Sequence, residues 1–159
     1  MVNDQVRESD LDRPVLFAYD GSDHAKSAIE QAGRDLRTPR SAVVVTVWQP
    51  FASIPYWGIA YGRVPDEFVE SVERSAMETA EEGVALAREA GFDPEPVATE
   101  GTPIWERILD IGKKADAGLI VTGSHGRTGI SYVALGSVAA AVLHHAEVPV
   151  LVARLAGGR

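Results

Sequence analysis

Two kinds of hydrophobic pattern alternate along the chain. One is a short continuous run of hydrophobic, often β-branched residues, which is typical of a strand buried in a parallel sheet. The other is a longer segment in which hydrophobic residues recur every three or four positions, which is typical of a helix with one buried face. These patterns predict five strands, at 15–19, 42–47, 95–99, 118–122 and 148–152, and four helices, at 25–36, 69–87, 103–115 and 137–145.

Residues at the ends of the predicted helices favour these boundaries. Ser22 is well placed to cap the first helix, and Gly91 follows the second helix where a glycine often ends one. Thr102 and Pro103 are interpreted as the N-cap and the first-turn proline of the third helix.

The alternation of strands and helices predicts the α/β class, with one open, doubly wound parallel sheet of five strands covered by four helices on its two faces. We expect this single domain to span 14–154. Residues 1–13 are polar and have no period, so they are interpreted as a disordered tail, and 155–159 as a short C-terminal tail.

Residues 49–65 are predicted to form a long loop that is unusually hydrophobic. One hypothesis is a lid over a ligand or a partner-binding patch, and the other, slightly favoured, is a loop packed on its own sheet or on a dimer mate. Its hydrophobic side chains are Phe51, Ile54, Tyr56, Trp57, Ile59 and Tyr61.

Composition narrows the class of protein. The 159 residues include 23 acidic and 15 basic side chains, for a formal charge of −8, and they contain no dense basic run of the kind that binds nucleic acid. Without cysteine there is neither a disulfide framework nor a thiolate metal site. Hydrophobic runs are far shorter than the roughly 20 residues that cross a bilayer, and no signal peptide is visible, so we expect a cytoplasmic protein.

The candidate chemistry lies where predicted strands end. The first strand is followed by Asp20, and the fourth by Gly123-Ser124-His125-Gly126, with Gly136-Ser137 opening the next helix. Glycines let backbone N–H groups approach an anion, and a helix N-terminus adds unpaired donors and partial positive charge. Together with Arg127 as a cation, these residues predict a phosphate cradle; the alternative is a glycine-rich turn that serves only tight packing.

Two common nucleotide motifs do not fit. A P-loop requires a lysine in a GxxxxGK[ST] pattern after the first strand, and none of the three lysines is there. The dinucleotide fingerprint GxGxxG is also missing after the first strand, which is followed by the single Gly21.

The spacing of Gly123, Gly126 and Gly136-Ser137 matches the G-2x-G-9x-G-[ST] motif of ATP-binding universal stress proteins. The flanking strands 119–122 and 148–152 and the segment 14–22 are similar to that family as well, so the resemblance covers roughly 13–154. It implies the strand order 3-2-1-4-5, a homodimer through the last strand, and ATP held without a fast catalytic cycle. The residues of that dimer edge are Val148, Pro149, Val150, Leu151 and Val152.

The same resemblance implies which residues contact the nucleotide. A divalent cation such as Mg²⁺ is expected beside the phosphates, with Asp20 as its candidate ligand, although Asp20 is also suited to a turn. The nucleotide-binding residues carried over by position are Ala18, Asp20, Val47, Thr122, Gly123, Ser124, Gly126, Arg127, Gly136, Ser137 and Val138. We expect valine at Gly123 or Gly136 to abolish binding while the fold survives.

The histidines are weaker candidates. His125 lies inside the motif, but a direct chemical role is the less favoured interpretation. His144 and His145 are adjacent on a predicted helix, point about 100° apart, and so cannot form an i, i+4 pair of metal ligands. Their expected role is favourable placement at a helix C-terminus.

Three functions remain open at this stage. The leading hypothesis is a dimeric, ATP-binding stress-response regulator, not an enzyme, that acts through nucleotide-dependent conformation or partner binding. The second is a slow ATPase or a nucleotide-transferring enzyme on the same fold, and the third a dimeric stress protein that binds no nucleotide. A phosphoacceptor receiver domain fits poorly, because the third strand ends in Thr99-Glu100 instead of an aspartate.

Overall fold

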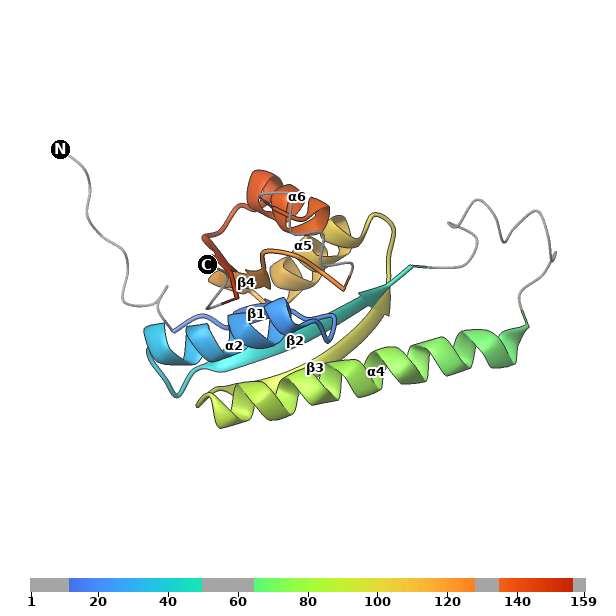
Figure 1. Cartoon of the computed structure of the whole chain (residues 1–159), viewed down its shortest axis with the longest axis horizontal. Coiled ribbons are helices and arrows are strands. Elements are labelled where there is room, and N and C mark those ends of the chain that lie inside the picture. The colour runs from blue at the N-terminus through green and yellow to red at the C-terminus, as the bar shows by residue number, and fades with distance from the viewer. Residues whose placement is uncertain (1–11, 50–64, 128–134, 156–159) are drawn as a thin grey trace.

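The computed structural model describes residues 12–49, 65–127 and 135–155, and in it strands and helices alternate as predicted. Figure 1 shows their arrangement. In chain order they are β1 (Val15–Ala18), α2 (Asp23–Asp35), β2 (Ser41–Trp48), α4 (Asp66–Glu89), β3 (Asp93–Glu100), α5 (Ile104–Lys114), β4 (Leu119–Gly123), α6 (Ser137–His145) and β5 (Val150–Ala153).

The strands form one parallel sheet in the order β3-β2-β1-β4-β5, which confirms the predicted fold class and strand order. The first strand is central: Ala18 lies opposite Val45 of β2 on one side and Thr122 of β4 on the other. The order reverses between β1 and β4, and in open parallel sheets ligands bind at such a point, beyond the carboxyl ends of the strands.

Two hydrophobic cores, one on each face of the sheet, explain why all the residues of β1 are hydrophobic. Successive side chains of a strand point to opposite faces. Val15 and Phe17 therefore pack in the core under α2 and α4, whereas Leu16 packs in the core under α5 and α6. Helices of both pairs cover the sheet in Figure 1, so the architecture is a three-layer sandwich.

The predicted helix ends are correct in two places and wrong in a third. The Ser22 hydroxyl accepts a hydrogen bond from the N–H of Ala25 (3.2 Å) at the start of α2, and Gly91 follows α4 with a φ of 97°. Thr102 is not the N-cap of α5. Pro103 occupies that position and Ile104 begins the helix, because the extended backbone of Pro103 delays the first helical turn by one residue.

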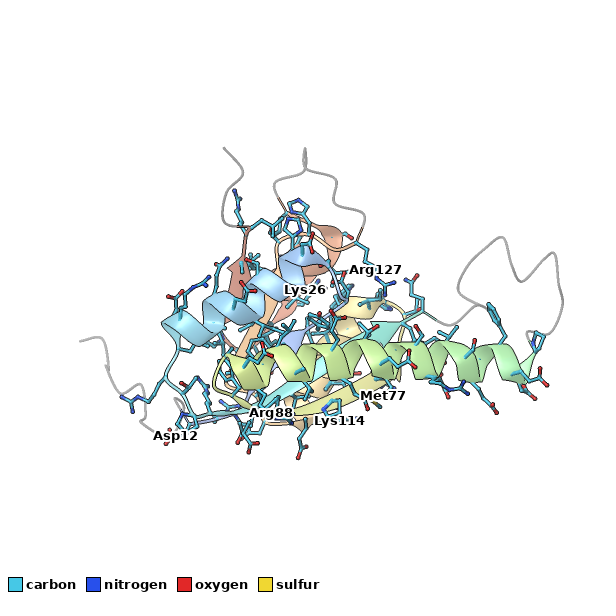
Figure 2. The ribbon with its side chains drawn as sticks, turned by 60° about the horizontal axis from the view of Figure 1, so that its bottom comes forward. Asp12, Lys26, Met77, Arg88, Lys114 and Arg127 are labelled. Carbon is cyan, nitrogen blue, oxygen red and sulfur yellow. The ribbon has the colours of Figure 1, made fainter. Side chains whose placement is uncertain are left out.

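The long helix α4 packs on the sheet along only part of its length. Its buried residues begin at Ala76, and its first turns extend past the end of the sheet in Figure 1. Phe68, in the first turn, is 44% exposed, and Met77 lies on the outer side of the helix seen in Figure 2. None of the described helices is long and hydrophobic enough to cross a membrane.

Several predictions concern the termini and the long loop, which lie largely outside the described residues. Residues 1–11, 156–159 and nearly all of the hydrophobic loop 49–65 lie outside the described residues. Arg13, at the end of the predicted N-terminal tail, forms a salt bridge with Asp116 (2.7 Å).

The two helices on one face of the sheet meet at Gly33 of α2. A Cβ atom at Gly33 would lie 2.7 Å from the Cβ and 2.8 Å from the carbonyl oxygen of Ala90, at the end of α4. These contacts are too short for any side chain, so the packing of α2 on α4 requires glycine there. At Gly112 of α5, the nearest atom to such a Cβ is the Leu16 Cδ2 atom at 3.2 Å, at the end of a side chain.

We therefore expect Gly33→Ala to lower the free energy of unfolding by about 1–2 kcal/mol, because overpacking outweighs the gain in helix propensity. The matched variant Gly112→Ala should change it by less than about 1 kcal/mol, because Leu16 can shift slightly. Urea denaturation followed by circular dichroism measures both. A Gly33→Ala protein as stable as the parent would contradict the close approach of α2 and α4.

Candidate functional site

A cavity of about 430 Å³ opens at the carboxyl ends of β1, β2 and β4, where the strand order reverses. Its size is within the range of small-molecule sites. Its walls come from these strand ends, the first turns of α2, α5 and α6, and the loop after β4. The lining residues are Ala18, Tyr19, Asp20, Ala25, Val45, Val47, Ile104, Ile108, Thr122, Gly123, His125, Gly126, Leu135, Gly136, Ser137, Val138 and Ala139.

The cavity has a hydrophobic part and a polar part. Val45 and Val47 of β2 and Ile104 and Ile108 of α5 supply hydrophobic walls. The isoleucines are four residues apart and therefore lie on one face of their helix. The polar part consists of Asp20, the glycine loop after β4, and the start of α6. This division suits a ligand that has a flat, weakly polar group at one end and an anionic group at the other.

Asp20 joins the turn after β1 to the loop after β4. Its Oδ1 atom accepts a hydrogen bond from the N–H of Ser22 (3.0 Å), and its Oδ2 atom accepts one from the N–H of Arg127 (3.2 Å). Gly21, between them, has a φ of 80°, which favours glycine. The expected turn role of Asp20 is thus confirmed, and Asp20 also lines the cavity.

The glycines of the motif have different roles, which their spacing alone does not reveal. A Cβ at Gly123 would lie 2.7 Å from the carbonyl carbon of His24, so this glycine lets α2 pack on the end of β4. Valine at Gly123 would displace that helix, so the expectation that the fold survives there is wrong. At Gly126, which lines the cavity, the nearest described atom to such a Cβ is Asp20 Oδ2, at 3.0 Å.

The start of α6 completes the polar part. Gly136 is its N-cap and Ser137 its first residue, and no side chain of the described residues caps this end. The N–H of Gly136 donates to the carbonyl of Ser124 (2.7 Å), which fixes the helix start against the glycine loop. The first N–H groups of a helix have no partner within it and carry partial positive charge, so this end can bind an anion.

Most predicted site residues line the cavity, but two do not. Ser124 is buried beneath it, where its N–H donates to the carbonyl of Ala153 (2.7 Å). Arg127 is exposed and contributes the backbone N–H that contacts Asp20. The other predicted nucleotide-binding residues, Ala18, Asp20, Val47, Thr122, Gly123, Gly126, Gly136, Ser137 and Val138, are brought together.

The histidines divide between two places. His125 lines the cavity, and its ring lies 5.2 Å, between centroids, from that of His24 in the first turn of α2. His144 and His145 lie in the last turn of α6, as expected, and the His145 ring stacks on Trp105 (4.4 Å). Among the described residues, no group of three or more metal-ligating side chains is found.

Comparisons with known proteins place the chain in a family. A family model described as "Universal stress protein family" matches residues 13–154, and the chain therefore belongs to the universal stress protein family. A universal stress protein of Bacillus subtilis is 32% identical over 154 residues, covering 88% of this chain and 97% of the relative. One from Methanocaldococcus jannaschii is 29% identical, with 97% and 89% covered.

Solved structures agree with this assignment. The structure of a hypothetical protein superimposes with a TM-score of 0.75 at 21% identity, covering 93% of this chain and 99% of that one. This likeness shows the fold. The universal stress protein of Archaeoglobus fulgidus in complex with dAMP is 26% identical, with a TM-score of 0.61 and 89% and 97% covered.

Next to the cavity, Tyr19 is a buried polar residue without a hydrogen-bond partner for its hydroxyl among the described residues. Burial raises the pKa of Tyr19 well above its ordinary value of 10.0, and the nearby Glu82 carboxylate of α4 adds to this rise. Glu82 itself accepts from Lys26 of α2 (2.8 Å), an interaction that lowers the pKa of Glu82. Figure 2 shows Lys26 on α2, beside α4.

Because the raised pKa means that the folded state favours neutral Tyr19, its contribution to stability is present below about pH 10 and is lost as the pH rises further. We expect the parent protein to lose about 1 kcal/mol more than Tyr19→Phe between about pH 9 and pH 11. Urea denaturation at each pH measures this; parallel loss in both proteins would contradict it.

Proposed function

We propose that this chain is a regulatory protein that binds ATP with a divalent cation and does not turn it over rapidly. The proposal rests mainly on the cavity, which has a hydrophobic part and a polar part suited to phosphate groups. Family relatives support the choice of an adenine nucleotide. The structural neighbours include universal stress proteins in complex with dAMP and with cAMP, and a protein of the family from Arabidopsis thaliana with AMP bound.

In this proposal the adenine base lies between the valines of β2 and the isoleucines of α5. The N–H of Tyr19 donates to the carbonyl of Val45 (2.9 Å), and the N–H of Gly101 donates to that of Trp48 (2.9 Å). Odd-numbered residues of β2 therefore turn their backbone groups toward β1, and Val47 does so beyond the last residue of β1. Its backbone can meet the edge of the base, as the family resemblance implies.

The phosphates occupy the polar part. Backbone N–H groups at Gly126 and at the start of α6 are the donors, and the Ser137 hydroxyl adds one more. Because the chain carries a formal charge of −8, these local dipoles are needed to offset the repulsion of a polyphosphate.

Asp20 is the proposed contact to the cation. Each of its oxygens accepts one backbone N–H, and a carboxylate oxygen has capacity for a further contact. Mg²⁺ commonly binds one or two carboxylates together with phosphates and water. A single aspartate at the edge of the cradle therefore fits a cation that arrives with the nucleotide.

The last strand is the proposed dimer contact. The N–H groups of Ile120 and Ser124 donate to the carbonyls of Pro149 (3.0 Å) and Ala153 (2.7 Å). By alternation, Val150 and Val152 turn their own N–H and C=O groups to the outer edge of the sheet. The opposite edge, β3, carries Pro94 and Pro96 among acidic residues, a combination that discourages pairing with another strand.

The nucleotide proposal is tested with Gly126→Val. The added side chain would fill the space beside Asp20 and block the cradle, so the Kd for Mg-ATP should rise about tenfold or more, as expected for lost hydrogen bonds to a charged group. Isothermal titration calorimetry measures it. Gly112→Ala, whose site is remote from the cavity, is the control and should bind normally.

A Gly126→Val protein that folds and keeps full affinity would overturn the cradle. The regulatory part of the proposal has its own test, which is ADP formation with saturating Mg-ATP. Turnover at about 1 s⁻¹ or faster is common for enzymes and would favour the enzyme hypothesis instead.

The dimer is tested with Val152→Pro. Proline removes one outward N–H while leaving the bonds to β4 in place, so the protein should shift from dimer to monomer in analytical ultracentrifugation. Val152→Thr has a similar shape and keeps the N–H, so it should remain dimeric. Equal association of the two variants would exclude pairing through β5.

A further inference from the structure

Two histidines meet at the polar end of the cavity, and the nucleotide motif does not account for both. His24 belongs to the first turn of α2, and His125 to the loop after β4. Their ring centroids are 5.2 Å apart, and the rings are tilted by 58°. His125 lines the cavity, and the ring of His24 lies beside the ring of His125, just behind the cavity wall.

Both side chains project from backbone that the packing fixes. The backbone of His24 packs so closely on Gly123 that a side chain at Gly123 would not fit between them. The Nδ1 atom of His125 lies 3.1 Å from the hydroxyl of Ser124, a residue buried and anchored by backbone hydrogen bonds to Ala153 and Gly136. The backbone of His24 and the ring of His125 are therefore positioned by contacts within the protein.

Among the described residues, few cationic side chains near this end of the cavity could contact a phosphate, so the imidazoles are candidates for that contact. Asp20 and Asp23 are the nearby acids, and Lys26 is paired with Glu82 at 2.8 Å. The guanidinium of Arg127 is exposed, at the outer end of the loop. A polyphosphate that extends past the glycine loop would meet the two imidazoles, which are hydrogen-bond donors and become cationic on protonation.

On the basis of the proposed function, we propose that His24 and His125 together hold the outermost phosphate of a nucleoside triphosphate. The glycine loop and the start of α6 bind the phosphates nearer the nucleoside, and the histidine pair adds contacts to the outermost phosphate. The pair therefore sets the preference of the site for a triphosphate over a monophosphate. His24 acts from α2 and His125 from β4, so the preference depends on the contact between these two elements.

The test compares the affinities of the full chain for Mg-ATP and for AMP. In His24→Ala and His125→Ala, the ratio of the AMP Kd to the ATP Kd should fall about tenfold, because one donor to a charged phosphate is lost while AMP affinity changes far less. The double variant should lose less than the product of the single losses, because both rings serve one phosphate. His125→Gln, which keeps a donor, should recover part of the ratio.

His144→Ala, at the far end of α6, is the matched control and should keep the parental ratio. If the parent binds neither nucleotide, the proposed function fails and this inference fails with it. If the parent binds both and the variants weaken both equally, or keep the ratio, the pair is only structural and this inference alone is overturned. His125→Ala decides the case if His24→Ala does not fold.

Discussion

Backbone pairing between β1 and β4 joins two parts of the chain that are far apart in sequence, and the cavity depends on it. Ala18 lies opposite Thr122. Two residues after Ala18, the Asp20 carboxylate accepts a hydrogen bond from the N–H of Arg127, which is 107 residues away in the sequence. Because the helices that follow β1 and β4 leave toward opposite faces, the space above these strand ends stays open. Every polar group of the candidate site lies at this junction or at the helix that follows β4.

The junction also determines how tightly the site is built. Gly123 admits the first turn of α2, and Gly136 holds the start of α6 against Ser124. These are packing requirements, whereas Gly126 lines the cavity and is the glycine proposed to contact a ligand. The same motif thus combines a structural glycine with a binding one, so a substitution within it affects either stability or affinity according to its position.

Hydrophobic periodicity was sufficient to predict the layers, and the positions of strand ends were sufficient to predict most of the polar part of the cavity. The strand order followed only from the resemblance to the universal stress protein family, because periodicity does not say which strands are neighbours. Ile104 and Ile108 were not predicted as site residues: they come from a helix whose hydrophobic face was expected to be core, and only the crossing of α5 over β2 brings them to the cavity. The pairing of His24 with His125 was also missed, because it depends on a tertiary contact. Thr102 was misplaced because a proline can end an extended segment as well as begin a helix.

The two halves of the helix α4 differ in how their order is maintained. It runs for 24 residues, but only the part from Ala76 onward is buried against the sheet. Residues 66–75 are exposed or half-buried, and a helical segment of about ten residues is marginal in water by itself, so continuity with the packed half of α4 adds to the order of these residues. Their amide protons should exchange by local fraying, whereas those after Ala76 require a larger cooperative opening. A single helix therefore spans the boundary between the cooperative core of this domain and a region whose order is set locally.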